Sequence, residues 1–370
     1  HGVRIERAWA TSFGKRTLPG RLIDYLSFYV GACCALMTLP RHDIVMALTT
    51  PPLIGLVAVI AGRIRGMRTV ALVQDIYPDV AVALGALKRN SLLTRLLDRL
   101  NRYILRHSDR IVVLGDCMRR RIVEKLGDAA VERIDVIHNW ADGDEISPIG
   151  SAKNGFVTEN NLESRFVVMF SGNFGHINDF QTVMSAAREM RDRPDVLFLF
   201  IGEGGKEKEL KDFAASNGLG NIRFMPYQAR EVTPLSLAAG HAMLVTLADG
   251  LAGLSVPSKT YPIMAAGRPL LFVGDQNSEA AKIARNGCGA AVASGDARGL
   301  VSVISDWAAD RSKPDALGRH AREIFENRFE RKHAVSSYIS MFHMCLVPEE
   351  RVGISKPESP SKITSPEKAG

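Results

Sequence analysis

The chain has 370 residues, of which 46% are hydrophobic and 24% charged, as is ordinary for a soluble globular protein. Its five cysteines are odd in number and form no C-x-x-C pair, which argues against a disulfide framework or a zinc site and favours a reducing compartment. The formal net charge of +7 is uneven, because residues 1–134 hold 21 Lys and Arg against 11 Asp and Glu.

A basic half suits a nucleic acid, an anionic membrane surface or an anionic substrate. The sequence has no zinc finger, aromatic RNA-binding motif or long polybasic run, so nucleic acid is the weakest of the three and we expect no such partner. The chain starts at His1 and shows no signal peptide. A doubly wound sheet normally opens with a strand and a glycine-rich turn, which are missing here, so we expect the first domain to be incomplete at its start.

The first half is predicted to begin with a strand over 2–10 and an apolar helix over 22–39. That helix reaches the minimum membrane-spanning length of ~18 residues, but Asp24 lies within it, so a buried or membrane-surface helix is favoured over a span. Strands and helices then alternate, which predicts a parallel sheet covered on both faces. The strands are predicted over 43–49, 68–73, 110–114 and 133–137, with helices over 51–64, 91–106 and 116–126.

Two carboxylates, Asp75 and Asp79, follow the predicted strand 68–73. Ligands bind at this edge of open α/β sheets, where a carboxylate can position or deprotonate a hydroxyl group. The alternative is that Asp79 caps the next helix and Asp75 is an ordinary loop residue.

The predicted helix 91–106 carries an apolar stripe and, on another face, four arginines at spacings of four, three and four residues. These are Arg95, Arg99, Arg102 and Arg106. Most such stripes are solvated. The alternative is contact with anionic lipid headgroups, which add about 1 kcal/mol for each basic residue near the surface.

A second alternating series follows residues 148–163, which are rich in Gly, Ser, Asn and Pro and are predicted to be a linker. The series predicts a second doubly wound domain over 164–346 that faces the first domain, 1–147, across a cleft. Its strands are predicted over 166–170, 196–201, 222–225, 242–247, 270–273 and 290–292, and its helices near 178–191, 206–217, 230–239, 257–266, 277–287, 296–309, 315–327 and 331–346. Residues 347–370 have little apolar content and are predicted to be a disordered tail.

Two segments of the second domain suggest an anion site. In residues 249–269, a Gly-rich loop leads to Pro257, which suits the first position of a helix. Lys259 would then lie in the first turn, and a helix start with a lysine there suits a phosphate. The loop 171–176 follows the first strand, and its glycines let backbone N–H groups approach a diphosphate. The alternatives are an ordinary loop before a buried helix and a tight strand-to-helix turn. Neither this loop nor 202–205 is a G-x-G-x-x-G fingerprint, so a nicotinamide dehydrogenase fits poorly.

Eight segments of the chain resemble glycosyltransferase family 4 of the two-domain GT-B fold. They include Ser171-Gly-Asn-Phe-Gly175, Val256-Pro-Ser-Lys259 and Ala265-Ala-Gly-Arg-Pro269. The others are 26–29, 47–52, 73–85, 139–142 and 224–227. The likeness is strongest to the bacterial branch that builds lipid-linked surface polysaccharides, often described as N-acetylfucosaminyl transferases.

The resemblance implies a donor site in the second domain for a nucleotide sugar, UDP-linked, and an acceptor site in the first. It implies retention of anomeric configuration, no obligatory metal and no cofactor besides the donor. The catalytic residues would be Asp75 and Lys259, with Lys259 as the cation for the departing diphosphate. The donor would be bound by Gly172, Asn173, Gly175, His176, Glu203, Tyr227 and Ser258.

Several positions depart from the family pattern. The family pairs two glutamates eight residues apart in the 249–269 segment, but Leu254 and Pro262 stand there, and Pro262 is expected to kink or restart the helix. His176 stands where relatives often carry arginine, so the second cation for the diphosphate, after Lys259, would carry a pH-dependent charge. His138 stands where relatives usually have proline.

The function implied is transfer of an N-acetylated deoxysugar or similar hexose from UDP to a polyprenyl-diphosphate-linked acceptor. The enzyme would be cytoplasmic and peripheral on the inner face of the plasma membrane, where the four arginines would meet the anionic surface. Two alternatives stay open: a UDP-sugar epimerase of the GT-B type, and a non-catalytic sugar-nucleotide-binding homologue.

Overall fold

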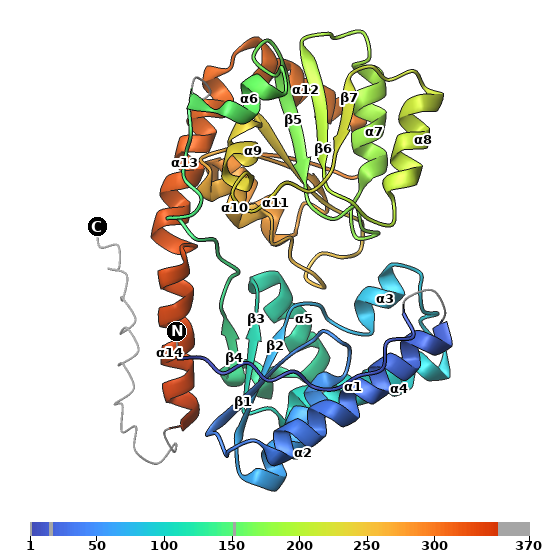
Figure 1. Cartoon of the computed structure of the whole chain (residues 1–370), viewed down its shortest axis with the longest axis vertical. Helices are drawn as coiled ribbons and strands as arrows, with labels where there is room; N and C mark the ends of the chain where they lie inside the picture. The colour runs from blue at the N-terminus through green and yellow to red at the C-terminus, as the bar shows by residue number, and fades with distance from the viewer. Residues whose placement is uncertain (1, 15–17, 151–152, 347–370) are drawn as a thin grey trace, which may run out of the picture.

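The computed structural model describes residues 2–14, 18–150 and 153–346, and the predicted tail lies outside this range. It contains two α/β domains, each built on a parallel sheet (Figure 1). The carboxyl ends of the two sheets face each other, because the segment after β2 in the first domain contacts the loop after β8 in the second.

The sheet of the first domain has the order β1-β2-β3-β4, with all pairs parallel. The strands therefore run in chain order, and the reversal that defines a doubly wound sheet is not seen among the described residues. The elements are α1 (Leu18–Thr38), β1 (Ile44–Leu48), α2 (Ile54–Arg65), β2 (Arg68–Val73), α3 (Asp79–Ala83), α4 (Leu92–His107), β3 (Arg110–Val113), α5 (Asp116–Leu126), the 3₁₀ helix η1 (Asp128–Arg133) and β4 (Ile134–Val136).

The predicted strand over 2–10 is wrong, since residues 2–14 form no regular structure. The segment instead crosses α1, where a side chain at Gly31 would lie 2.2 Å from the Trp9 carbonyl oxygen. The Asp24 carboxylate accepts hydrogen bonds from the N–H groups of Phe13 at 2.9 Å and Gly14 at 3.1 Å, and these bonds lower its pKa. The one acidic residue in the apolar helix therefore fastens the N-terminal segment to that helix.

The sheet of the second domain is doubly wound, with the order β10-β9-β8-β5-β6-β7 and its reversal point between β5 and β8. Buried phenylalanines on β5, β6 and the following loops form its core. Its elements are β5 (Phe166–Ser171), α7 (Phe180–Glu189), β6 (Val196–Ile201), α8 (Glu207–Ser216), β7 (Ile222–Met225), α9 (Thr233–Ala239), β8 (Ala242–Leu247), α10 (Thr260–Ala265), β9 (Leu270–Gly274), α11 (Glu279–Ile283), the π-helical turn η3 (Ala284–Cys288), β10 (Gly289–Val292), α12 (Ala297–Ala309) and α13 (Ser312–Arg328).

The region predicted to be a linker contains a short helix, α6 (Gly155–Glu159). Its Phe156 and Val157 side chains are buried, and the Asn154 amide donates a hydrogen bond of 2.8 Å to the Leu235 carbonyl. This segment therefore packs against α9. Two adjacent apolar side chains are enough to bury it, although its sequence has no helical repeat.

The last helix, α14 (Arg331–Leu346), returns to the first domain and lies beside its sheet (Figure 1). Its Tyr338 ring packs at 6.0 Å from Trp140, and Arg331 pairs with Asp142. The chain therefore passes between the domains twice. The two connecting segments lie side by side, since the Arg331 N–H donates to the Ala141 carbonyl at 3.1 Å. The prediction had placed this helix with the second domain.

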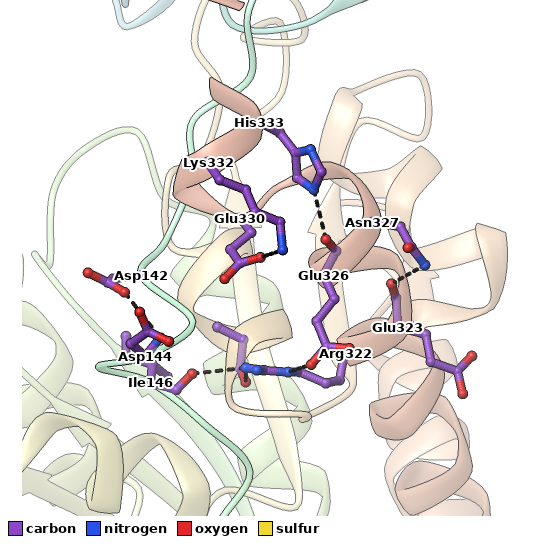
Figure 2. Close-up of polar contacts among 11 residues, drawn as sticks. Asp142, Asp144, Ile146, Arg322, Glu323, Glu326, Asn327, Glu330, Lys332 and His333 are labelled. Carbon is purple, nitrogen blue, oxygen red and sulfur yellow. Dashed lines mark hydrogen bonds and ion pairs between the residues drawn. The ribbon is translucent and has the colours of Figure 1, made fainter. Parts of the chain in front are cut away.

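Arg322 of α13 joins the first connecting segment to helix α10, which directly follows Lys259. Its guanidinium donates to the carbonyls of Ile146 at 2.9 Å and Ala265 at 2.6 Å, and it pairs with Glu326 (Figure 2). The side chain is only 18% exposed, so these bonds are partly shielded from water. Arg322 therefore fixes the carboxyl end of α10 against the segment that enters the second domain.

Within the described residues, no helix is both long enough and apolar enough to cross a bilayer. Each of the ten strands in the described part of the chain matches a strand predicted from the sequence. All five cysteines are free thiols.

Candidate active site

The carboxyl end of β2 meets the loop of residues 249–259 from the other domain. The Ile76 N–H donates to the Leu254 carbonyl at 2.9 Å, and Asp75 pairs with Ser255 in an antiparallel bridge. Burial raises the pKa of Asp75, while a hydrogen bond from the Ser255 side chain acts in the opposite direction. The structure thus brings together two segments that the sequence singled out separately.

The backbone before Asp75 is held by Thr49 at the end of β1. The Thr49 hydroxyl oxygen accepts from the N–H groups of Gln74 at 3.1 Å and Asp75 at 3.3 Å. The other predicted carboxylate points elsewhere, since Asp79 pairs with Lys125 of α5. Of the two predicted carboxylates, Asp75 is therefore the one that contacts the second domain directly.

Helix α10 starts later than predicted. Its first residue is Thr260, and Lys259 precedes it as the N-cap, whereas the prediction began the helix at Pro257. Pro262 lies in the first turn, where an N–H group has no helical partner, so it neither kinks nor restarts the helix. Gly267 follows the helix with φ +64°, as the sequence predicted for a helix end.

The Lys259 amine points back to the end of β5. Its Nζ lies 3.4 Å from the centre of the Phe170 ring, and a side chain at Gly172 would come within 3.2 Å of it. Removal from water lowers the pKa of Lys259 to about 7. The ring attracts the charged form of the amine, but no carboxylate pairs with it among the described residues. A bound anion would supply that partner.

The predicted glycine loop 171–176 interlocks with the loop 202–205. A side chain at Gly202 would lie 2.1 Å from the Gly172 carbonyl oxygen, and one at Gly204 would lie 2.4 Å from Asn173 Oδ1. The Phe174 N–H donates to the Glu203 carbonyl at 2.8 Å. Only glycine allows this approach, and both residues have positive φ.

Some backbone N–H groups of this loop are left for a ligand. The N–H groups of Asn173 and Gly175 donate to no acceptor within the described part of the chain. Asn173 is exposed and Gly175 half-buried, and both lie within four residues of the end of β5. Free N–H groups beside a lysine amine form an environment suited to phosphate oxygens.

The other predicted donor-binding residues surround these loops. Exposed His176 lines a hollow of about 450 Å³ together with Lys206 and Asp249. Glu203 and Tyr227 are exposed at the ends of β6 and β7, where partial burial and then the Glu203 charge raise the pKa of Tyr227. Exposed Ser258 precedes Lys259.

A contact missed by the sequence analysis joins α5 to α11. The Cys117 N–H donates to Glu279 Oε2 at 3.4 Å, and the Cys117 thiol donates to the Asn277 carbonyl at 3.0 Å. Lys282 Nζ lies 3.2 Å from the same sulfur. The Asp275–Glu279 segment had no recognisable motif, so only the meeting of the two domains could reveal this contact.

The four arginines of α4 do not all face solvent as predicted. Arg95, Arg99 and Arg106 are exposed, but Arg102 pairs with Asp98 at 2.6 Å and donates to the Lys125 carbonyl. The predicted apolar stripe also differs, because its first turns lie outside the core. Leu92 is 82% exposed, Leu93 54% and Leu96 55%. Exposed leucines and arginines therefore lie together at the amino-terminal half of this helix.

Two family descriptions match the chain, one for each domain. Residues 1–140 match "Glycosyl transferase 4-like domain" and residues 153–324 match "Glycosyl transferases group 1". The predicted glycosyltransferase resemblance is confirmed at this level, while the N-acetylfucosaminyl branch stays a prediction.

Two curated relatives are similar over nearly two thirds of the chain. The probable glycosyltransferase WbjE of Pseudomonas aeruginosa is 32% identical over 66% of this chain and 60% of its own length. The putative colanic acid biosynthesis glycosyl transferase WcaI of Escherichia coli K12 is 26% identical over 62% of this chain and 57% of its own. The matched region thus spans less than two thirds of each relative.

Among solved structures, Anabaena Alr3699/HepE in complex with UDP-glucose superposes with a TM-score of 0.69 at 17% identity, over 89% of this chain and 84% of that one. The predicted GT-B fold with two parallel-sheet domains is confirmed. The chain therefore matches a glycosyl transferase 4-like domain and then a glycosyl transferases group 1 domain, and it has the GT-B fold.

Proposed function

We propose that the protein is a retaining glycosyltransferase that moves a sugar from a UDP-sugar to a polyprenyl-diphosphate-linked acceptor. The sugar would be an N-acetylated deoxyhexose or a similar hexose, and the pathway would be surface polysaccharide biosynthesis. One observation carries the proposal: the Lys259 amine lies beside the glycine loop at Gly172, while Asp75 of the other domain pairs with Ser255, four residues before Lys259.

The donor half of the proposal depends on charge. A departing nucleoside diphosphate develops negative charge on its oxygens, and preformed positive groups stabilise it most where water is excluded. Lys259 and the free N–H groups of Asn173 and Gly175 would provide this stabilisation without a metal. Gly172, His176, Glu203, Tyr227 and Ser258 would complete the donor site. The UDP-glucose complex of HepE supports UDP as the nucleotide.

The acceptor half depends on Asp75 and on the basic first domain. Asp75 would orient or deprotonate the attacking hydroxyl, and its raised pKa suits a group that exchanges a proton. The exposed arginines and leucines of α4 would hold the enzyme on the anionic inner face of the plasma membrane. The similarity to WcaI, a putative colanic acid biosynthesis glycosyl transferase, supports a pathway of this kind.

Binding of a panel of UDP-, GDP- and TDP-sugars, measured by isothermal titration calorimetry, tests the donor assignment. We expect UDP-sugars to bind most tightly and Lys259→Ala to weaken them at least tenfold. Lys208→Ala is the matched control, since that lysine is 88% exposed and lies on α8. Equal affinity of Lys259→Ala and wild type would remove the phosphate assignment.

The two alternative functions are not favoured, because both family matches and both curated relatives are glycosyltransferases. An epimerase would turn over UDP-sugar without any acceptor, whereas a transferase requires the acceptor for turnover.

A further inference from the structure

A hollow of about 580 Å³ opens where the first domain meets the loop of residues 249–259. Its inner end is formed by Ile76, next to Asp75, and by Gly250 and Leu254 of the second domain. Its walls come from α3, α4 and α5. The hollow therefore leads away from the proposed reaction centre along the first domain.

Basic side chains dominate the walls. The hollow is lined by Arg89, Arg95, Arg102, Arg121 and Lys125 against the three acids Asp79, Asp98 and Glu124. Each acid already has a basic partner. Buried Lys125 bridges Asp79 and Asp98, Arg102 pairs with Asp98, and Arg121 lies 3.5 Å from Glu124.

Two arginines remain without an acidic partner. Exposed Arg89 and Arg95 form no ion pair within the described part of the chain. The lining residues thus leave two uncompensated positive charges, which match the two negative charges of a diphosphate diester. The Lys125 bridges tie α3, α4 and α5 together, so the wall that carries Arg95 is fixed, while Arg89 lies in the turn between α3 and α4.

The outer end of the hollow becomes apolar. A neighbouring hollow of about 440 Å³ shares Arg95 and Asp98 with it and is otherwise lined by Leu92, Leu96 and Arg99. Since Leu92 is 82% exposed and Leu96 55%, these side chains present hydrocarbon to the outside of the protein. The hollow therefore runs from the domain junction past cationic walls to an apolar outer end.

We propose that this hollow binds the diphosphate of the lipid-linked acceptor between Arg89 and Arg95. The sugar would reach inward to Asp75, and the lipid chain would leave over Leu92 and Leu96. The inference rests on the proposed function and gives its acceptor a defined site. It also assigns Arg95 to substrate binding, beyond the general contact with lipid headgroups expected of the four arginines.

Binding of farnesyl diphosphate, a short soluble polyprenyl diphosphate, tests the site by isothermal titration calorimetry. We expect the double variant Arg89→Gln/Arg95→Gln to bind it at least tenfold more weakly than wild type. Arg106→Gln is the matched control, because Arg106 is an exposed arginine of the same helix that lines neither hollow. Both arginines are exposed and unpaired, so the variant is expected to fold.

Two further ligands define the chemistry. Farnesol, without phosphates, and inorganic diphosphate, without hydrocarbon, should each bind at least tenfold more weakly than farnesyl diphosphate. Inorganic diphosphate that binds equally well would mean a site for free diphosphate and would overturn the lipid assignment. The Lys259→Ala variant should keep the farnesyl diphosphate affinity, and loss of binding there would mean that the probe occupies the donor site, which also overturns the inference.

Failure of this inference can be told from failure of the proposed function. UDP-glucose affinity should be unchanged in the double variant. If UDP-glucose binds while the double variant, Arg106→Gln and wild type bind farnesyl diphosphate equally, the acceptor site is wrong and the donor assignment stands. If farnesyl diphosphate binding depends on Arg89 and Arg95 but no UDP-sugar binds, the site stands and the proposed donor is wrong.

Discussion

Raising the pH from 7.0 to 8.5 is expected to weaken the binding of UDP-glucose, because the Lys259 amine loses its proton over this range. Removal of the amine from water lowers its pKa to about 7 in the free protein. A bound diphosphate favours the charged amine and raises its pKa, so the affinity is highest below pH 7 and falls as pH rises through the free-protein value.

The magnitude follows from the fraction of protonated amine. With a pKa of about 7, about half of the amines are charged at pH 7.0 and about 3% at pH 8.5. If only the charged amine contributes to binding, the affinity falls about fifteenfold, or ~1.6 kcal/mol. UDP-glucose is the preferred ligand, because its diphosphate is esterified at both ends and keeps its charge over this range.

Isothermal titration calorimetry at several pH values measures this change, together with the protons taken up when the same titration is repeated in buffers of different ionisation enthalpy. Wild type should take up about half a proton at pH 7.0 and nearly one at pH 8.5. Lys259→Ala should bind weakly with a flat pH profile. An unchanged affinity in wild type, or a profile that persists in Lys259→Ala, would refute the assignment of this amine to the diphosphate.

Three further substitutions test other parts of the site. Gly204→Ala should weaken UDP-glucose binding at least tenfold by calorimetry, because its Cβ would lie 2.4 Å from Asn173 Oδ1, whereas Gly205→Ala, with 3.5 Å to its nearest neighbour, should bind normally. Arg322→Ala should lower the free energy of unfolding by about 2 kcal/mol in urea titrations, through loss of its bonds to the Ile146 and Ala265 carbonyls. Equal loss in the exposed Arg319→Ala would contradict that cause. Asp75→Asn should lower the transfer rate about a hundredfold and leave UDP-glucose affinity unchanged, and a parallel loss of affinity would mean a structural role instead.

The strands and the glycine loops could be predicted because their signals are local. Runs such as 196–201 are apolar throughout, as buried parallel strands are, and glycines that follow such a run at 172 and 202 mark the loops at the sheet edge. The placement of Lys259 at the end of β5 could not be predicted. Its contact with the Phe170 ring joins residues 89 positions apart, and no local pattern encodes that approach.

The errors have physical causes that can be named. Pro262 was expected to break a helix, but the helix begins only two residues earlier, so the missing N–H costs nothing. Arg102 belongs to the arginine stripe by spacing, yet the Asp98 carboxylate lies four residues before it and draws it into an ion pair. Residues 155–159 lack a helical repeat and fold against α9 through two side chains.

The central claim is transfer of a sugar from a UDP-sugar to a lipid-linked acceptor with retained configuration. The direct measurement incubates the purified protein with UDP-sugar labelled in its sugar and a polyprenyl-diphosphate-linked acceptor, and follows the label into lipid, the release of UDP and the anomeric proton of the product by NMR. We predict one UDP released for each labelled lipid formed, no turnover without acceptor, and the same anomeric configuration in product and donor. Turnover without acceptor, an inverted product, or no labelled lipid with any UDP-sugar would contradict the account.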